Sequence, residues 1–183
     1  MKEFNELRET MDSSSEIFNG KILHVLRDEI TLPGGGKSFR ELIRHVGAVC
    51  VIPVTEDNRA VVERQYRYPI DSVITEIPAG KLDSSAEDRL EAAKRELREE
   101  TGITADEWID MGVFYSAPAY SDEKITMYLA RKLHFGQQEL DEGEFLNVEL
   151  VPMEELIRQV MNNEIPDSKT ETAILKAARI LGL

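Results

Sequence analysis

Apolar and polar positions divide the chain into extended segments on either side of one long helix. Residues 46–54 form a continuous apolar run, and residues 60–67, after a polar turn, are predicted to form the returning strand. Continuous apolar runs of this length are typical of strands that are buried on both faces. Residues 124–133 alternate between apolar and polar side chains, which predicts a further strand. Shorter strands are predicted at residues 73–77, 108–115 and 145–151.

The long helix is predicted between Ser84 and Gly102. Ser84 stands three residues before Glu87, which is the spacing of a capping box at the start of a helix. Gly102 stands where a left-handed residue usually ends a helix. An apolar stripe that can pack on a core follows the i, i+3, i+7 spacing: Leu90, Ala93 and Leu97.

Two more helices are predicted near the C-terminus. One covers residues 154–161, and the other follows Ser168, which forms a second capping box with Glu171. The last helix carries its own apolar positions: Ile174, Leu175, Ala178 and Leu181. Strands around one long helix, with helices at the end, predict an α+β fold with a layered sheet.

The N-terminal region has a different pattern. Residues 1–13 are polar and predict a loose helix or a frayed tail, whereas alternating apolar positions after Glu16 predict strands with a break at Asn19 and Gly20. Residues 33–36 read as a turn before another extended segment. Because this ribbon has little apolar surface, we expect it to pack on something larger. We therefore divide the chain into residues 1–45, an N-terminal β-ribbon, and residues 46–183, the main domain.

Composition excludes several classes of function. The 183 residues are 42% apolar and 31% charged, which is ordinary for a globular protein. A net charge of −13 argues against nucleic acid and anionic membranes as partners. The sequence has neither an apolar run of about 18 residues nor a signal peptide, so we expect a cytoplasmic protein. Cys50 lies inside an apolar run and is expected to be buried.

Three carboxylates on the long helix are the candidate chemistry. Glu96, Glu99 and Glu100 fall within an arc of roughly 100° on the helix surface, an arrangement that suits a hard divalent cation. The alternative is a solvated charged face, because like charges at i, i+4 cost only about 0.2–0.5 kcal/mol. Spacing alone does not decide between the two, but the order of residue types does.

That order resembles the Nudix box of hydrolases that act on linked nucleoside diphosphates. Gly80, Glu87 and the run from Arg95 to Ile103 match the box in type and nearly in spacing. Six residues separate Gly80 from Glu87, where the family pattern has five. The extra residue falls in the polar loop before the helix, where an insertion costs little chain entropy.

The resemblance implies a fold and a metal site. The fold would be the Nudix α/β/α sandwich, a mixed sheet flanked by helices, here with an added antiparallel ribbon. The cofactor would be Mg²⁺, with Mn²⁺ as an alternative. Its implied ligands are the side chains of Glu96, Glu99 and Glu100 and the backbone carbonyl of Ala79. Arg95 would pair with a box carboxylate such as that of Glu87, and Gly80 and Gly102 would have structural roles.

Features outside the box are similar to those of ADP-ribose pyrophosphatases. Pro118 stands 16 residues after Gly102, and residues 63–69, 76–80 and 165–173 fit the same group. The resemblance implies Mg²⁺-dependent hydrolysis of ADP-ribose to AMP and ribose 5-phosphate by a homodimer. The alternatives are a hydrolase of other nucleoside diphosphate sugars or of dinucleoside polyphosphates, and a non-catalytic ADP-ribose sensor. The intact box glutamates argue against the sensor.

Four residues outside the box are candidates for contact with the substrate. Arg67 and Arg64 carry planar cations that suit a diphosphate, although either could instead form an ion pair with Glu63 or Glu76. By resemblance, Pro118 and Asp122 belong to a substrate-binding loop.

The candidate catalytic residues are Glu99 and two glutamates of the acidic loop, Glu142 and Glu144. Solvated charge is the alternative for the loop pair, but in the family a glutamate of this loop serves as general base or as an extra metal ligand. Glu144 directly precedes a predicted strand, and we assign it to the metal and Glu142 to the base.

Overall fold

The computed structural model describes residues 4–140, 142–143 and 145–183. The chain divides into two compact units. The first consists of Met1–His45 together with Tyr115–Glu123, and the second of Val46–Phe114 together with Lys124–Leu183.

The first unit is built on a three-stranded antiparallel sheet. After a short 3-10 helix, η1 (Asn5–Leu7), the strands follow in the order β1 (Thr10–Asn19), β2 (His24–Thr31) and β3 (Lys37–Arg44). All ten residues of β1 are exposed. The prediction of a helix or tail over residues 1–13 is therefore wrong from Thr10 onward. Backbone pairing with β2 forms this strand although it has no apolar alternation. Residues 1–3 lie outside the described part of the chain.

The second unit contains two sheets. One has the order β10–β5–β6 and the other the order β7–β4–β9–β8. Strands β4 and β9 are parallel, whereas β4 and β7 are antiparallel, so the larger sheet is mixed. The bounds are β4 (Ala48–Pro53), β5 (Arg59–Arg67), β6 (Ser72–Glu76), β7 (Ala79–Lys81), β8 (Ile103–Tyr115), β9 (Lys124–Phe135) and β10 (Leu146–Pro152).

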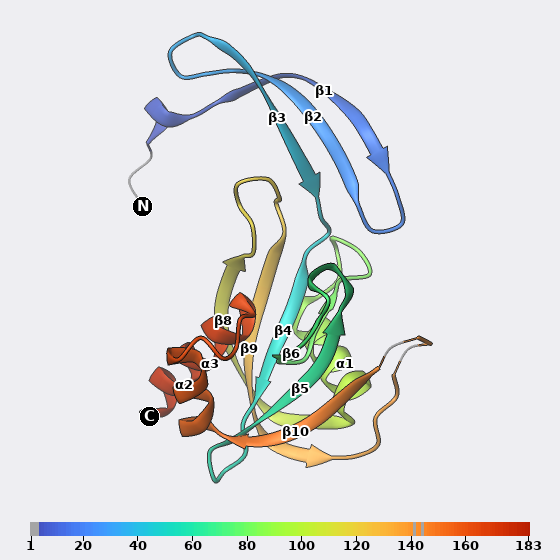
Figure 1. Ribbon diagram of the computed structural model, residues 1–183, viewed down its shortest axis with the longest axis vertical. Helices are drawn as coiled ribbons and strands as arrows, with labels where there is room; N and C mark the ends of the chain where they lie inside the picture. The colour runs from blue at the N-terminus through green and yellow to red at the C-terminus, as the bar shows by residue number, and fades with distance from the viewer. Residues whose placement is uncertain (1–3, 141, 144) are drawn as a thin grey trace. The chain divides into compact units, whose positions relative to one another are not determined.

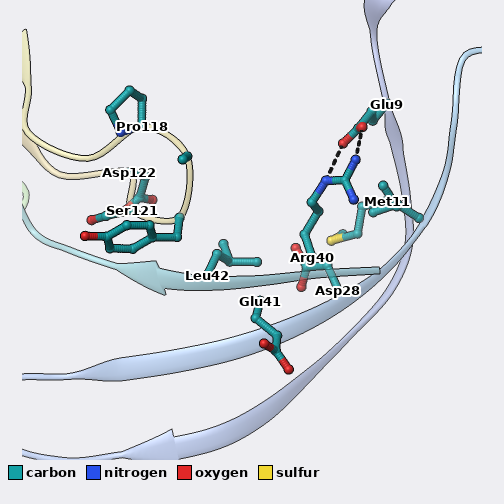
Figure 2. A pocket seen from close by; sticks show the side chains of 12 residues that line it. Glu9, Met11, Asp28, Arg40, Glu41, Leu42, Pro118, Ser121 and Asp122 are labelled. Carbon is teal, nitrogen blue, oxygen red and sulfur yellow. Dashed lines mark hydrogen bonds and ion pairs between the residues drawn. The ribbon is translucent and has the colours of Figure 1, made fainter. Parts of the chain in front are cut away.

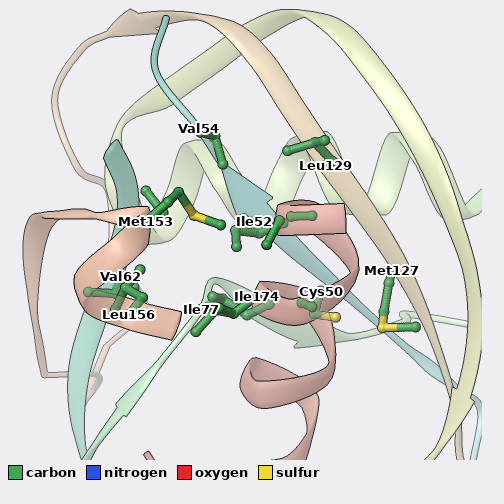
Figure 3. Packing of buried hydrophobic residues seen from close by; sticks show 14 of the residues in the cluster. Cys50, Ile52, Val54, Val62, Ile77, Met127, Leu129, Met153, Leu156 and Ile174 are labelled. Atoms are coloured by element: carbon green, nitrogen blue, oxygen red, sulfur yellow. The ribbon is translucent and has the colours of Figure 1, made fainter. Parts of the chain in front are cut away.

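Helices cover both faces of the mixed sheet (Figure 1). They are α1 (Arg89–Thr101), α2 (Met153–Met161) and α3 (Ser168–Leu181), with a 3-10 turn, η2 (Tyr68–Ile70), after β5. Successive side chains of β4 alternate between two apolar clusters. Val49 and Val51 join the α1 cluster, whereas Cys50 and Ile52 join the cluster under α2 and α3 (Figure 3). The α+β prediction is confirmed, as is the burial of Cys50.

Both predicted capping boxes are wrong, and for the same reason. Asp88 is the N-cap of α1, and its carboxylate accepts the backbone N–H groups of Leu90 and Glu91. Asp167 caps α3 in the same way, so Ser168 is already helical. In each case an aspartate next to the helix takes the cap. The left-handed C-cap at Gly102 is confirmed, with φ of 71°.

Candidate metal-binding and hydrolytic site

The site is built on one face of α1. Ala93 and Leu97 are fully buried in the core, which fixes the rotation of the helix. Glu96 and Glu100 lie one turn apart beside this apolar stripe and are themselves 9% and 5% exposed. Buried carboxylates need hydrogen bonds or counter-charges, and they find them in a backbone loop and in Arg95.

The backbone at the start of β7 lies directly against these carboxylates. The N–H of Ala79 donates to Glu100 Oε2 at 2.8 Å. A Cβ at Gly80 would lie 2.0 Å from the carboxylate carbon of Glu96, so any side chain at this position would displace that carboxylate. Strand β7 is held in place because Ala79 and Gly80 pair with Cys50 and Val49 of β4. Pairing within the sheet thus positions the backbone of Ala79 and Gly80 against Glu100 and Glu96.

Arg95 links the box carboxylates to one another. Its Nη1 donates to Glu96 Oε1 at 2.8 Å and to Glu99 Oε2 at 3.3 Å, while Nη2 donates to Glu87 Oε1 at 3.3 Å. Desolvation alone would lower the pKa of Arg95, but Glu96 and Glu87 outweigh it and the net shift is upward. Arg95 is therefore a permanent counter-charge, and the expected ion pair with Glu87 is present.

Glu87 reaches the box in spite of the extra residue before it. It lies ahead of α1, where its second carboxylate oxygen accepts the N–H of Asp83 at 2.7 Å. The loop between β7 and α1 therefore accommodates the additional residue, and Glu87 stays within hydrogen-bonding distance of Arg95.

The donor set fits a hard divalent cation. Glu100 and Glu96 lie against the backbone of Ala79 and Gly80, and Glu99 is linked to Glu96 through Arg95. All three carry carboxylate oxygens, the type of ligand that Mg²⁺ or Ca²⁺ prefers. Among the described residues, no group of three or more acidic, histidine or cysteine side chains is arranged so that it could hold a metal ion directly. Arg95 bridges Glu96 and Glu99 instead, so a bound cation would share or replace that guanidinium contact.

The two candidate arginines face different partners. Arg67 forms a bidentate pair with the buried carboxylate of Glu76, at 2.5 and 2.8 Å, yet its side chain stays 43% exposed. One edge of the guanidinium, Nε and Nη2, is thus fixed by Glu76, while the side chain as a whole stays partly exposed. Arg64 lies three positions earlier on β5, on the opposite face, and pairs with Glu149 of β10 at 3.0 Å.

The predicted substrate loop belongs to the first unit. Asp122 accepts the backbone N–H of His45 at 2.8 Å and a hydrogen bond from Arg44 at 3.1 Å. Pro118 and Asp122 line a cavity of about 380 Å³ together with residues of β1, β2 and β3 (Figure 2). Asp122 therefore anchors the loop to Arg44 and His45 within the first unit.

The acidic loop between β9 and β10, residues 136–145, makes contacts with α1 that the sequence did not predict. Glu142 is exposed in a turn, and Glu144 lies outside the described residues. Gln138 Nε2 donates to the carbonyl of Glu100 at 2.5 Å, and the N–H of Glu139 donates to the carbonyl of Glu99 at 2.9 Å. These bonds satisfy backbone groups in the last turn of α1. No periodic pattern marks such contacts, and the segment reads as solvated charge.

Comparison with known proteins agrees with this geometry. Residues 44–171 match the NUDIX domain. The ADP-ribose pyrophosphatase of Bacillus subtilis is 38% identical over 92% of this chain and 91% of its own. The methanol dehydrogenase activator of Bacillus methanolicus is 37% identical, over 88% of each chain. The ADP-ribose pyrophosphatase of Mycobacterium tuberculosis is 34% identical over 89% of this chain and 80% of its own.

A solved structure shows the same fold. The crystal structure of an ADP compounds hydrolase superposes with a TM-score of 0.82, covering 96% of this chain and 95% of that one. The two chains are 24% identical, so the likeness speaks for the fold and not for the substrate.

Proposed function

Because the chain belongs to the Nudix family of hydrolases, we propose that it hydrolyses the pyrophosphate bond of ADP-ribose to AMP and ribose 5-phosphate, with Mg²⁺ as cofactor. The observation that carries the proposal is the packing of the Ala79–Gly80 backbone against Glu96 and Glu100. Two relatives named ADP-ribose pyrophosphatase, alike over most of the chain, support the choice of substrate.

The residues of the site have distinct tasks in this proposal. Glu96, Glu99, Glu100 and the Ala79 carbonyl would hold Mg²⁺, which neutralises phosphate charge and lowers the pKa of a bound water. Arg95 would keep the carboxylates orientated, because its guanidinium contacts Glu96 and Glu99 at once.

The remaining tasks concern the diphosphate and the water. The partly exposed side chain of Arg67 would bind diphosphate oxygens, and Arg64, Pro118 and Asp122 stay candidates for further contacts with the substrate. In the reaction, a water oxygen bonds to one phosphorus while the bond from that phosphorus to the bridging oxygen breaks. A carboxylate accepts the proton of the water. We assign this role to Glu142, with Glu144 nearer the metal.

We also propose that the active form is a homodimer in which residues 14–45 pack on the partner subunit. Strand β1 is exposed along its whole length and carries Ile17 and Phe18, which are 60% and 56% exposed. Exposed apolar side chains on a sheet of this kind are typical of an interaction surface.

A panel of substrates tests the proposed activity. ADP-ribose, other nucleoside diphosphate sugars and dinucleoside polyphosphates are each incubated with Mg²⁺ and the enzyme, and a coupled phosphatase reports the phosphate monoesters released. We expect the highest kcat/KM for ADP-ribose. A clear preference for another member would reassign the substrate. Binding of ADP-ribose without turnover would indicate a sensor.

Activation of a dehydrogenase is a second candidate function, since one relative at 37% identity is named methanol dehydrogenase activator. The test adds the wild type, or a variant that no longer hydrolyses ADP-ribose, to a methanol dehydrogenase assay. Comparing the dehydrogenase rates separates the two functions.

A further inference from the structure

The N-terminus of α3 is hydrogen-bonded to the segment that leads into β7, where Ala79 and Gly80 contact the box glutamates. Thr170 is fully buried, and its Oγ1 accepts the backbone N–H of Ile77 at 3.0 Å. The same hydroxyl donates to Asp167, the helix cap, at 2.5 Å. One side chain therefore joins a helix cap to a backbone N–H that lies 93 positions earlier in the chain.

Lys169 adds a second attachment one residue away. Its side chain is 11% exposed, and Nζ forms ion pairs with Glu76 and with Asp167. Burial alone would lower the pKa of Lys169, but Asp167 and Glu76 outweigh it, so the lysine stays charged. Glu76 is 1% exposed and binds Arg67 with both carboxylate oxygens. The lysine thus fixes the carboxylate that fixes the arginine.

Apolar packing makes the connection rigid. Ile174, one turn after Thr170 on α3, and Ile77 are both fully buried and belong to the same cluster (Figure 3). Because protein interiors are close-packed, they transmit the displacement of one buried side chain to its neighbours.

The attached segment continues directly into the site. Ile77 is followed by Pro78, whose carbonyl accepts the N–H of Val51 at 2.8 Å, and then by Ala79, whose N–H holds Glu100. A shift of Ile77 would be passed on to Ala79 and Gly80 because only one residue separates Ile77 from Ala79. Displacements near 1 Å at a catalytic site can cost about 100-fold in rate.

We propose that Thr170 and Lys169 are positioning residues for hydrolysis: Thr170 holds the Ala79–Gly80 backbone against the metal carboxylates, and Lys169, through Glu76, orientates Arg67 toward the substrate. The expected effect of Lys169 on KM rests on the proposed function, because it takes ADP-ribose as the substrate. The expected effect of Thr170 on Mg²⁺ affinity does not depend on that substrate. The two neighbouring residues of one helix thus have separate effects.

The role of Thr170 is tested by measuring the affinity for Mg²⁺. Thr170→Val keeps the shape and removes the hydroxyl, and Thr170→Ser restores it. Thr172→Val is the matched control, because the Thr172 hydroxyl donates to the Ser168 carbonyl within α3. Binding of Mg²⁺ alone is followed by calorimetry and by the rise in Tm that it causes. We expect Mg²⁺ affinity to fall about tenfold in Thr170→Val and to change less than about twofold in the other two.

The Lys169 arm is tested by kinetics. Lys169→Met should raise KM for ADP-ribose about tenfold while Mg²⁺ affinity stays near that of the wild type. Lys176→Met, on the same helix, removes a lysine that bonds to the Met111 carbonyl and not to Glu76 or Asp167, and it should leave both unchanged. A purely structural role would lower Tm in Lys169→Met and Thr170→Val without this split between KM and metal affinity.

Two results would overturn the inference. One is a folded Thr170→Val variant with wild-type Mg²⁺ affinity, and the other is a Lys169→Met variant with wild-type KM. If Thr170→Val does not fold, Lys169→Met decides alone, because methionine is a good helix former. If the wild type binds Mg²⁺ but does not hydrolyse ADP-ribose, the proposed substrate fails, and the calorimetric arm still tests the role of Thr170.

Discussion

Gly80 lies directly against the carboxylate of Glu96: a Cβ on Gly80 would lie 2.0 Å from the carboxylate carbon and 2.1 Å from Oε1 of Glu96. The glycine belongs to β7 and the glutamate to α1. Their contact joins the edge of the sheet to the face of the helix that carries the carboxylates. The site is therefore a product of packing between two elements, and the first prediction follows from it.

Gly80→Ala should damage the site more than the fold. The atoms that the new methyl group meets are the far end of a flexible side chain, so Glu96 moves aside at little cost in stability. We expect kcat/KM to fall at least about tenfold because a displaced ligand weakens the metal site. Gly34→Ala is the control, since a Cβ at Gly34 meets nothing within 4 Å. Wild-type kinetics in Gly80→Ala would show that Glu96 is not held as described.

The ion pairs of Glu76 should make stability depend on pH. Burial alone would raise the pKa of Glu76, but Arg67 and Lys169 outweigh it and lower the pKa below its usual 4.5. The stabilisation is therefore complete above pH 4.5 and is lost as the pH falls through the lower pKa of the folded state. Urea unfolding of the wild type between pH 3 and 7 should show this acid-side loss. Glu76→Gln should be less stable near neutrality and should lack this part of the pH slope.

The two loop glutamates should respond differently to amide substitution. Glu142→Gln should lower kcat and leave the Mg²⁺ requirement nearly unchanged, because a general base acts on the water. Glu144→Gln should raise the Mg²⁺ concentration for half-maximal rate. Measuring kcat across a Mg²⁺ titration for each variant separates the roles. The reverse pattern would exchange them, and two silent variants would return the loop to solvated charge.

The exposed ribbon should mediate dimerisation. Light scattering at micromolar concentration should give about twice the 20.8 kDa mass of the chain. Replacing Ile17 and Phe18 with aspartate should shift the protein to the monomer. Leu175→Asp, which changes an exposed apolar residue of α3, should not. A monomeric wild type would refute the proposed assembly.

The sequence predicted those parts of the fold that periodicity records. The apolar run over residues 46–54 predicted a strand buried on both faces, and Val49 and Cys50 do face opposite clusters. The stripe of Ala93 and Leu97 likewise predicted which face of α1 enters the core. The first part of β1, residues 10–15, escaped prediction because its order comes from pairing with β2 and not from its own side chains, whereas the predicted end of the strand at Asn19 is confirmed.

The site was predictable only where residue order along α1 carried it. Glu96, Glu99 and Glu100 are neighbours on one helix, so spacing alone places them on one face. The contacts of Thr170 with Ile77 and of Lys169 with Glu76 join positions far apart in sequence, and no local pattern reports them. Both capping errors arose because serine and glutamate at the right spacing competed with an aspartate that was better placed.

The most direct test of the central claim is the rate of ADP-ribose hydrolysis with Mg²⁺ by the wild type, Glu100→Gln and Glu91→Gln. Both substitutions remove a carboxylate from α1 and keep its shape, but Glu91 is largely exposed and pairs with Lys94, whereas Glu100 is buried against Ala79. We expect the wild type to release AMP and ribose 5-phosphate, Glu91→Gln to stay within about twofold, and Glu100→Gln to lose about 100-fold or more. A wild type without turnover, or a folded Glu100→Gln variant with near wild-type turnover, would contradict the account.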